Sequence, residues 1–179
     1  MLERKAQKRK AIIEDLGVHN GNAIVDIIAV YKTMHDFEIK GETDSVSRVS
    51  KQSVYYNVSL PKLTLVTTQN HLSWASKHLP AFWGIILAKK DQEGQVRLTH
   101  KRPAKNNPNF SKETSLLMLW KAELLNPRFQ ILETEVRQND SRAELATKIA
   151  ARLTKDQIAA LLATSINDRE KTKVFLRQK

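Results

Sequence analysis

The first hundred residues alternate between short apolar runs and polar turns, which predicts strands joined by turns and helices. Runs of strand length and apolar character lie at 11–18, 23–30, 35–40, 62–68, 82–89 and 94–101. The segment HNGN separates the first two runs, and Asn-Gly is a strong signal for a tight hairpin. The first three runs are therefore predicted to form consecutive antiparallel strands.

Two stretches between these runs have helical spacing. Residues 44–56 are predicted to form a helix with Asp44 as its N-cap, and residues 71–78 a helix that ends before Pro80. Residues 2–12 also have a helix-like pattern, rich in basic side chains. The run 62–68 is of the kind buried in a mixed or parallel sheet. Together these elements predict an α/β fold, a mixed central sheet flanked by helices.

The last third of the chain has a different, helical character. A loop rich in Pro and Asn at 102–110 precedes predicted helices at 111–125, 141–153 and 154–171, with a strand or extended connector at 129–136. Trp120 is predicted to pack in the core between the sheet and this tail. The chain is accordingly divided into a core of residues 1–105 and a small helical extension of residues 106–179, packed on or near the core.

The charge, cysteine content and apolar runs of the chain limit the classes of protein to which it could belong. The chain has 179 residues, 41% of them hydrophobic, a net charge of +11 and a pI of about 9.9. Such a charge favours a polyanionic partner, although a solvated basic surface is the simpler alternative. The chain has no cysteine, which excludes disulfides and cysteine-ligated zinc, and no apolar run long enough for a bilayer. A cytoplasmic protein with no membrane association is expected.

Three charged residues in the second and third runs are candidates for chemistry. Asp26 interrupts the apolar run IVDIIAV, where a carboxylate is costly unless it is paired or binds a cation. Glu38 and Lys40 are two apart in HDFEIK, so they share one face of a strand. If the two strands are neighbours, the three side chains converge on one site suited to a divalent cation and a phosphodiester. An ordinary ion pair between strands is the alternative.

A further pair of polar residues follows on the predicted helix. Gln52 and Tyr56 are one helical turn apart and share a face, so both could reach the same site or a nucleic-acid backbone. The alternative is that Tyr56 packs in the core while Gln52 lies on the surface.

This order of residues resembles the PD-(D/E)XK nuclease superfamily. The resemblance rests on Asp26, the Glu38-x-Lys40 triplet twelve residues later, and the Gln52-x-x-x-Tyr56 element, which is similar to that of the RecB-like branches. More narrowly, the chain resembles an uncharacterised bacterial family of that superfamily from about residue 11 to residue 169, which indicates a bacterial or phage origin.

Two features depart from the usual pattern of the superfamily. Val25 precedes Asp26 where a proline is usual, and Glu14 is the only candidate for the extra acid that a leading helix often supplies. The resemblance implies a restriction-endonuclease-like core followed by the helical extension.

The resemblance also implies a mechanism, the metal-dependent hydrolysis of phosphodiester bonds in nucleic acid, with DNA as the expected substrate. Mg²⁺, or Mn²⁺ in its place, would be bound by Asp26, Glu38 and the main-chain carbonyl of Ile39. Lys40 would orient the attacking water, with Gln52 and Tyr56 completing the catalytic set. The alternative is a non-catalytic module that binds nucleic acid or protein and retains the nuclease fold.

Basic residues near the predicted core are candidates for phosphate contacts, which carry affinity without reading sequence. One set is the N-terminal cluster, in particular Lys8 and Arg9 beside Lys5 and Lys10. The other set is Lys101, Arg102 and Lys105, where the last strand run gives way to a loop. The basic C-terminal tail is interpreted as a solvated end.

Overall fold

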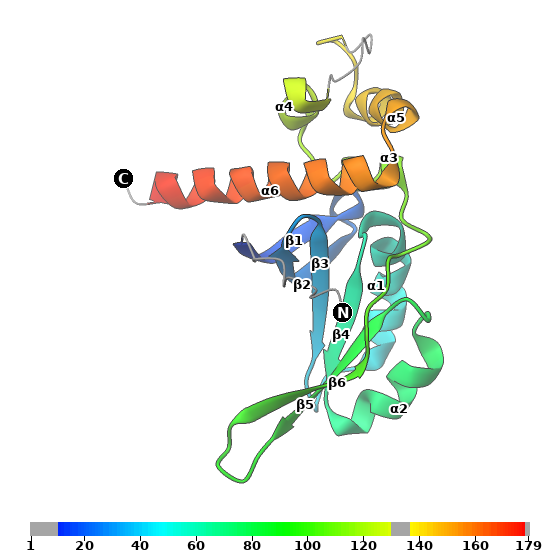
Figure 1. Ribbon diagram of the computed structural model, residues 1–179, viewed down its shortest axis with the longest axis vertical. Coiled ribbons are helices and arrows are strands. Elements are labelled where there is room, and N and C mark those ends of the chain that lie inside the picture. Colours follow the sequence, from blue (N-terminus) through cyan, green and yellow to red (C-terminus); the bar gives the residue numbers. More distant parts are fainter. Residues whose placement is uncertain (1–10, 130–136, 178–179) are drawn as a thin grey trace, which may run out of the picture.

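A six-stranded sheet forms the centre of the computed structural model, which describes residues 11–129 and 137–177 (Figure 1). Its strands follow the chain order: β1 (Ala11–Val18), β2 (Ala23–Val30), β3 (Met34–Lys40), β4 (Leu63–Thr67), β5 (Gly84–Lys90) and β6 (Val96–Arg102). Strands β1 to β3 are antiparallel, β3 to β5 are parallel, and β6 returns antiparallel to β5. The predicted α/β fold with a mixed sheet is confirmed.

The connection between β1 and β2 explains the Asn-Gly signal. A single 3₁₀ turn, η1 (His19–Gly21), joins the strands, with Asn20 at φ 63° and Gly21 at φ 88°. These left-handed conformations are strained for most residues and easy for Asn and Gly. The prediction that residues 2–12 form a helix falls largely outside the described residues, and Ala11 and Ile12 belong to β1.

Two helices connect the parallel strands, as parallel pairing requires. Helix α1 (Val46–Ser59) joins β3 to β4, and α2 (Gln69–His78) joins β4 to β5. The predicted N-cap of α1 is wrong, because Asp44 lies outside the cap position. Its carboxylate instead accepts a hydrogen bond from the Gly41 amide at 2.7 Å and closes the turn after β3.

The C-terminal segment contains four helices and a 3₁₀ turn within the described residues. These are α3 (Lys112–Leu116), α4 (Lys121–Leu124), η2 (Pro127–Phe129), α5 (Arg142–Arg152) and α6 (Lys155–Arg177). Helices α5 and α6, both predicted, begin directly after Ser141 and Thr154, whose side-chain oxygens accept hydrogen bonds from the Glu144 and Gln157 amides. The predicted connector at 129–136 lies outside the described residues except for Phe129. No helix of the described chain combines the length and apolar content needed to cross a bilayer.

The single helix predicted for 111–125 is wrong. Helix α3 ends at Leu116, and a second helix starts after Trp120, whose amide donates to the Glu123 carboxylate at 2.7 Å. This new helix start turns the Trp120 ring outward, so its predicted place in the core is also wrong. Trp120 is 54% exposed and lies under the Arg169 guanidinium, 4.4 Å from the ring centroid.

Helix α6 crosses one end of the antiparallel strands (Figure 1). Its buried residues Ile158, Leu162 and Ile166 belong to the same apolar cluster as Val25 of β2 and Tyr56 of α1. The helical segment therefore shares a core with the sheet, which holds the strands that carry the candidate site.

Gly84 marks the closest approach of β4, β5 and the loop after β6. A Cβ at this position would lie 2.5 Å from Thr64 Oγ1 and 3.0 Å from Ala104. We therefore expect Gly84→Ala to lower the free energy of unfolding by about 1–3 kcal/mol, the usual cost of overpacking. Urea denaturation checks this, with Gly17→Ala as the control, because its Cβ would have no neighbour closer than 3.9 Å. Equal losses in the two variants would contradict the account of this contact.

Candidate functional site

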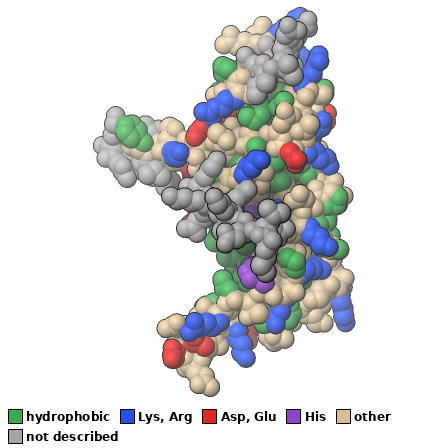
Figure 2. Space-filling model, viewed as in Figure 1, with side chains coloured by type: hydrophobic (Ala, Val, Ile, Leu, Met, Phe, Trp, Pro, Cys, Tyr) green, Lys and Arg blue, Asp and Glu red, His purple; other side chains and the backbone are tan. Residues whose placement is uncertain are grey.

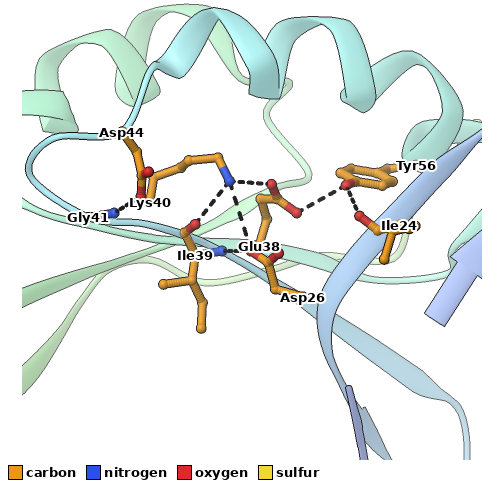
Figure 3. Close-up of polar contacts among 8 residues, drawn as sticks. All are labelled: Ile24, Asp26, Glu38, Ile39, Lys40, Gly41, Asp44 and Tyr56. Atoms are coloured by element: carbon orange, nitrogen blue, oxygen red, sulfur yellow. Dashed lines mark hydrogen bonds and ion pairs between the residues drawn. The ribbon is translucent and has the colours of Figure 1, made fainter. Parts of the chain in front are cut away.

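The candidate site lies where β2 and β3 separate. Their regular pairing ends at Ile27 and Phe37. Beyond that point Asp26 Oδ2 accepts a hydrogen bond from the Ile39 amide at 2.7 Å, so a side chain takes the place of a ladder carbonyl (Figure 3). The Asp26 side chain remains 40% exposed. The carboxylate is therefore fixed by β3 and still open to solvent.

The ammonium group of Lys40 brings the other oxygens together. Its Nζ donates to Glu38 Oε1 at 2.6 Å and to the Ile39 carbonyl at 3.0 Å, and lies 3.9 Å from Asp26 Oδ2 (Figure 3). Glu38 and Lys40 share a face because strand side chains alternate, whereas the Ile39 side chain points to the opposite face. One cationic group thus lies against the three oxygens that the sequence suggested as metal ligands.

Tyr56 holds Glu38 from the helix side. Its hydroxyl lies 2.6 Å from the Ile24 carbonyl and 3.1 Å from Glu38 Oε2 (Figure 3). Burial and the charge of Glu38 raise the pKa of the Tyr56 hydroxyl, so it stays protonated and acts as a donor. Tyr56 is fully buried and also contacts the site, so it combines the two roles that were posed as alternatives.

Glu38 is the most constrained carboxylate of the three-residue site. It is only 1% exposed, and burial raises its pKa, an effect that the hydrogen bond and positive charge of Lys40 oppose. Its negative charge is therefore stable only next to a cation or a strong donor. Lys40 supplies that cation here.

A second buried carboxyl, Asp36, was missed by the sequence analysis. It is completely buried two residues before Glu38, and neither side-chain oxygen has a hydrogen bond of normal geometry. Burial raises its pKa well above the usual value, and the charges of Glu38 and Asp26 add to the shift. The signal was present in the sequence, because the alternation in HDFEIK places Asp36 on the same face as Glu38 and Lys40.

Gln52 lies one turn before Tyr56 on α1. Its Oε1 is buried and has no hydrogen-bond partner in the described structure. No hydrogen bond joins it to Asp26, Glu38 or Lys40 among the described contacts, so its predicted catalytic role stays a prediction. A buried acceptor without a protein partner is available to a water.

The predicted phosphate contacts divide into three groups. Lys101 on β6 and Lys105 in the following loop are exposed, as a phosphate contact requires. Arg102 instead directs its guanidinium to the carbonyls of Trp83, Pro80 and Leu79, at 2.7, 3.2 and 3.4 Å, so we remove it from the set. The predicted contacts Lys8 and Arg9, with Lys5 and Lys10, lie outside the described residues.

The chemical type of the possible ligand atoms determines which metal ion could bind at this site. Within residues 11–129 and 137–177, no three His, Cys, Asp or Glu side chains converge in a way that could hold a metal ion. What the site offers is two carboxylates and one carbonyl, all hard oxygen donors. This set matches the ligands of Mg²⁺, which keeps several waters, and does not match a structural zinc site.

The burial of Asp36 predicts a pH-dependent cost in stability. Because its pKa is higher in the folded than in the unfolded chain, the free energy of unfolding should fall as pH rises above about 4 and through the folded pKa. Asp36→Asn cannot ionise, so its stability relative to the parent protein should increase with pH over that interval. Urea denaturation in EDTA between pH 4 and 8 measures the difference, with the exposed Glu113→Gln as control. Parallel pH profiles for Asp36→Asn and the parent would contradict the prediction.

Comparisons with known proteins place the chain in a family. No curated protein matches it. One matching solved structure, SPO1766, a protein of unknown function from Silicibacter pomeroyi, is 15% identical, with a TM-score of 0.41; the match covers 54% of this chain and 60% of that one. The model of a phage family, described as bacteriophage P4 protein cII, matches residues 1–179, in agreement with the expected bacterial or phage origin. The chain therefore belongs to the bacteriophage P4 protein cII family.

Proposed function

We propose that this protein is a metal-dependent nuclease that hydrolyses phosphodiester bonds in DNA, with Mg²⁺, or Mn²⁺, as cofactor. The observation that carries the proposal is the position of the Lys40 ammonium group. It lies 2.6 Å from Glu38, 3.0 Å from the Ile39 carbonyl and 3.9 Å from Asp26. A simple ion pair requires one carboxylate, whereas here oxygens from two strands are directed at one cation.

The order of the elements supports the same proposal. Strands β1, β2 and β3 are antiparallel, α1 crosses over, and β4 joins parallel to β3. Asp26 lies on the second of these strands and the Glu38-x-Lys40 triplet on the third, so the chain order of the three residues places them on neighbouring strands.

The residues present fit a hard divalent cation. Mg²⁺ is usually bound by one or two carboxylates and keeps waters and substrate oxygens as its other ligands. When bound, such a metal polarises the phosphoryl oxygen and lowers the pKa of a bound water. Lys40 has a long, flexible stem, so its ammonium group can leave the carboxylates when a metal ion replaces it.

Each residue then has a distinct task. Asp26 is fixed by the Ile39 amide and exposed toward the substrate. Tyr56 keeps the Glu38 carboxylate in one orientation. Lys40, once displaced, orients the attacking water and offsets the negative charge that develops on the phosphorane. The proposal thus requires Lys40 to move from its present hydrogen bonds while Asp26 and Glu38 stay in place.

DNA is the proposed substrate because of charge. A net charge of +11 attracts a polyanion and accelerates its association at low salt. Lys101 and Lys105 are exposed on the described surface and available for phosphate contacts.

One observation favours a second candidate, a module that binds nucleic acid or protein without cutting. Glu38 and Lys40 are 1% and 8% exposed, so they form a closed pair. A buried pair of this kind can persist as a purely structural contact. The two candidates differ in one property, since only the nuclease requires a divalent cation at Asp26 and Glu38.

Cleavage assays on the parent protein and its variants test the nuclease. Asp26→Asn and Glu38→Gln should each reduce cleavage by about 100-fold or more, because the metal contributes several kcal/mol to the transition state. Lys40→Met should also reduce turnover but weaken metal binding less. Supercoiled, linear and single-stranded DNA and RNA, with Mg²⁺, Mn²⁺ or EDTA, provide the measurement.

The control is Glu113→Gln, which removes an exposed carboxylate on α3 away from the site. It should cut like the parent protein. Parental activity in all three site variants would show that the cleavage arises elsewhere. Binding without cleavage in any metal would favour the non-catalytic module.

A further inference from the structure

The hairpin of β5 and β6 projects beyond the rest of the sheet (Figure 1). Strand β5 pairs with β4 only as far as Leu87, opposite Thr67. Beyond that point residues 88–90 and 96–98 pair only with each other, and a turn at 91–95 joins them. We call residues 88–98 the β5–β6 arm. All residues of β6 before Arg102 are exposed, so the arm is not needed to fill the core.

One face of the arm is mainly basic, although the Asp91 carboxylate also lines it and pairs with Arg97 at 2.8 Å. Lys89 and Arg97 are directly opposite each other, and Lys101 lies further along the same face. With Thr99 and Gln69 of α2 they line a shallow hollow of about 670 Å³. Figure 2 shows Lys and Arg side chains on this projection beside Asp and Glu side chains near its tip. The other face carries Val96 and Leu98, each 60% exposed, with the exposed Lys90 opposite Val96.

The tip of the arm is held rigid by its own hydrogen bonds. The Asp91 carboxylate accepts from the amides of Glu93 and Gln95 at 3.0 and 2.9 Å and from Arg97 Nε at 2.8 Å. Gly94, at φ 80°, completes the turn. A two-stranded hairpin without packing is marginal in water, so these bonds fix its shape. A preformed arm loses little conformational entropy when it binds a partner.

The basic face of the arm continues the face that carries the candidate site. The register runs from Lys40 to Thr67, then to Leu87 and Thr99, and opposed residues share a face. Lys40 and Leu87 are two strand spacings apart, about 10 Å. The arm therefore extends from the same end of the sheet as Glu38 and Lys40.

We propose that the β5–β6 arm inserts into the major groove of duplex DNA and holds a backbone phosphodiester at the Asp26–Glu38–Lys40 site. This inference rests on the proposed nuclease function and adds the substrate class, double-stranded B-form DNA. The major groove is about 12 Å wide and 8.5 Å deep and admits a two-stranded ribbon. The paired part of the arm, three residues on each strand, reaches about 10 Å.

The chemistry of the arm favours a duplex over other nucleic acids. Single-strand binding relies on aromatic side chains that stack on bases, and the arm has none. The major groove of duplex RNA is too deep and narrow for side chains to read. Lys89 and Lys101, with Arg97 beside Asp91, instead suit the phosphates on the walls of a wide groove.

Charge reversal on the arm tests the inference. The variant Lys89→Glu/Arg97→Glu/Lys101→Glu is made in the cleavage-deficient Asp26→Asn protein. Its matched control is Lys121→Glu/Arg152→Glu/Lys171→Glu, which makes the same change in net charge at exposed positions on α4, α5 and α6. Fluorescence anisotropy in EDTA measures binding to duplex DNA, single-stranded DNA and duplex RNA between 50 and about 200 mM salt.

We expect the arm variant to bind duplex DNA at least about tenfold more weakly. The slope of log K against log salt should flatten by two to three, at about 0.9 for each phosphate that the arm no longer neutralises. The control should weaken less and keep most of its slope. A second variant replaces residues 89–97 by Asn-Gly, which closes a short hairpin. It should also weaken duplex binding, by less than the charge reversal, because Lys101 remains and no repulsive charge is added.

Three outcomes overturn the inference. DNA binding could weaken equally in the arm variant and the control, or the arm variant could lose affinity equally for duplex and single-stranded DNA. The third outcome is that the arm variant changes its oligomeric state and keeps its DNA affinity. The last would assign the unpaired edge of β6 to a second copy of the chain. The proposed function is tested separately by metal-dependent cleavage in the parent protein. Loss of cleavage with intact arm-dependent binding, or the reverse, identifies which proposal fails.

Discussion

The convergence of three oxygens on the Lys40 ammonium group is the interaction on which the rest of the site depends. Lys40 offsets the charge of Glu38, which is almost fully buried, and links it to the main chain of β3. The Asp26 carboxylate joins β2 to β3 where their regular pairing has ended. Without a cation at this point, the buried Glu38 carboxylate would have no positive charge beside it and would be repelled by the partly exposed Asp26 carboxylate.

The same arrangement lowers the stability of the fold. Asp36 and Glu38 both have raised pKa values because they are buried, and Asp36 has no hydrogen-bond partner of normal geometry. A sheet selected only for stability would carry apolar residues at these positions. The surrounding structure holds these groups in place, because Tyr56 contacts Glu38 and helix α6 lies across one end of the strands. Several destabilising buried groups close together are typical of functional sites.

Most of the correct predictions from the sequence rested on local patterns. The alternation of strand side chains and the Asn-Gly turn are local properties, and they were enough to bring Asp26, Glu38 and Lys40 together. The break before Trp120, its exposure, and the use of Arg102 to bind carbonyls depend on contacts between distant segments. No local pattern encodes these contacts, so the sequence analysis assigned Trp120 to the core and Arg102 to phosphate.

The central claim is that Lys40 occupies the place of a divalent cation. A crystal structure of the protein with Mn²⁺, located by its anomalous scattering, tests this claim most directly. The account predicts a peak about 2.1 Å from oxygens of Asp26 and Glu38, with the Lys40 ammonium group displaced from Glu38. The absence of a peak at saturating Mn²⁺, with Lys40 still 2.6 Å from Glu38, would contradict it and leave the contact as a structural ion pair.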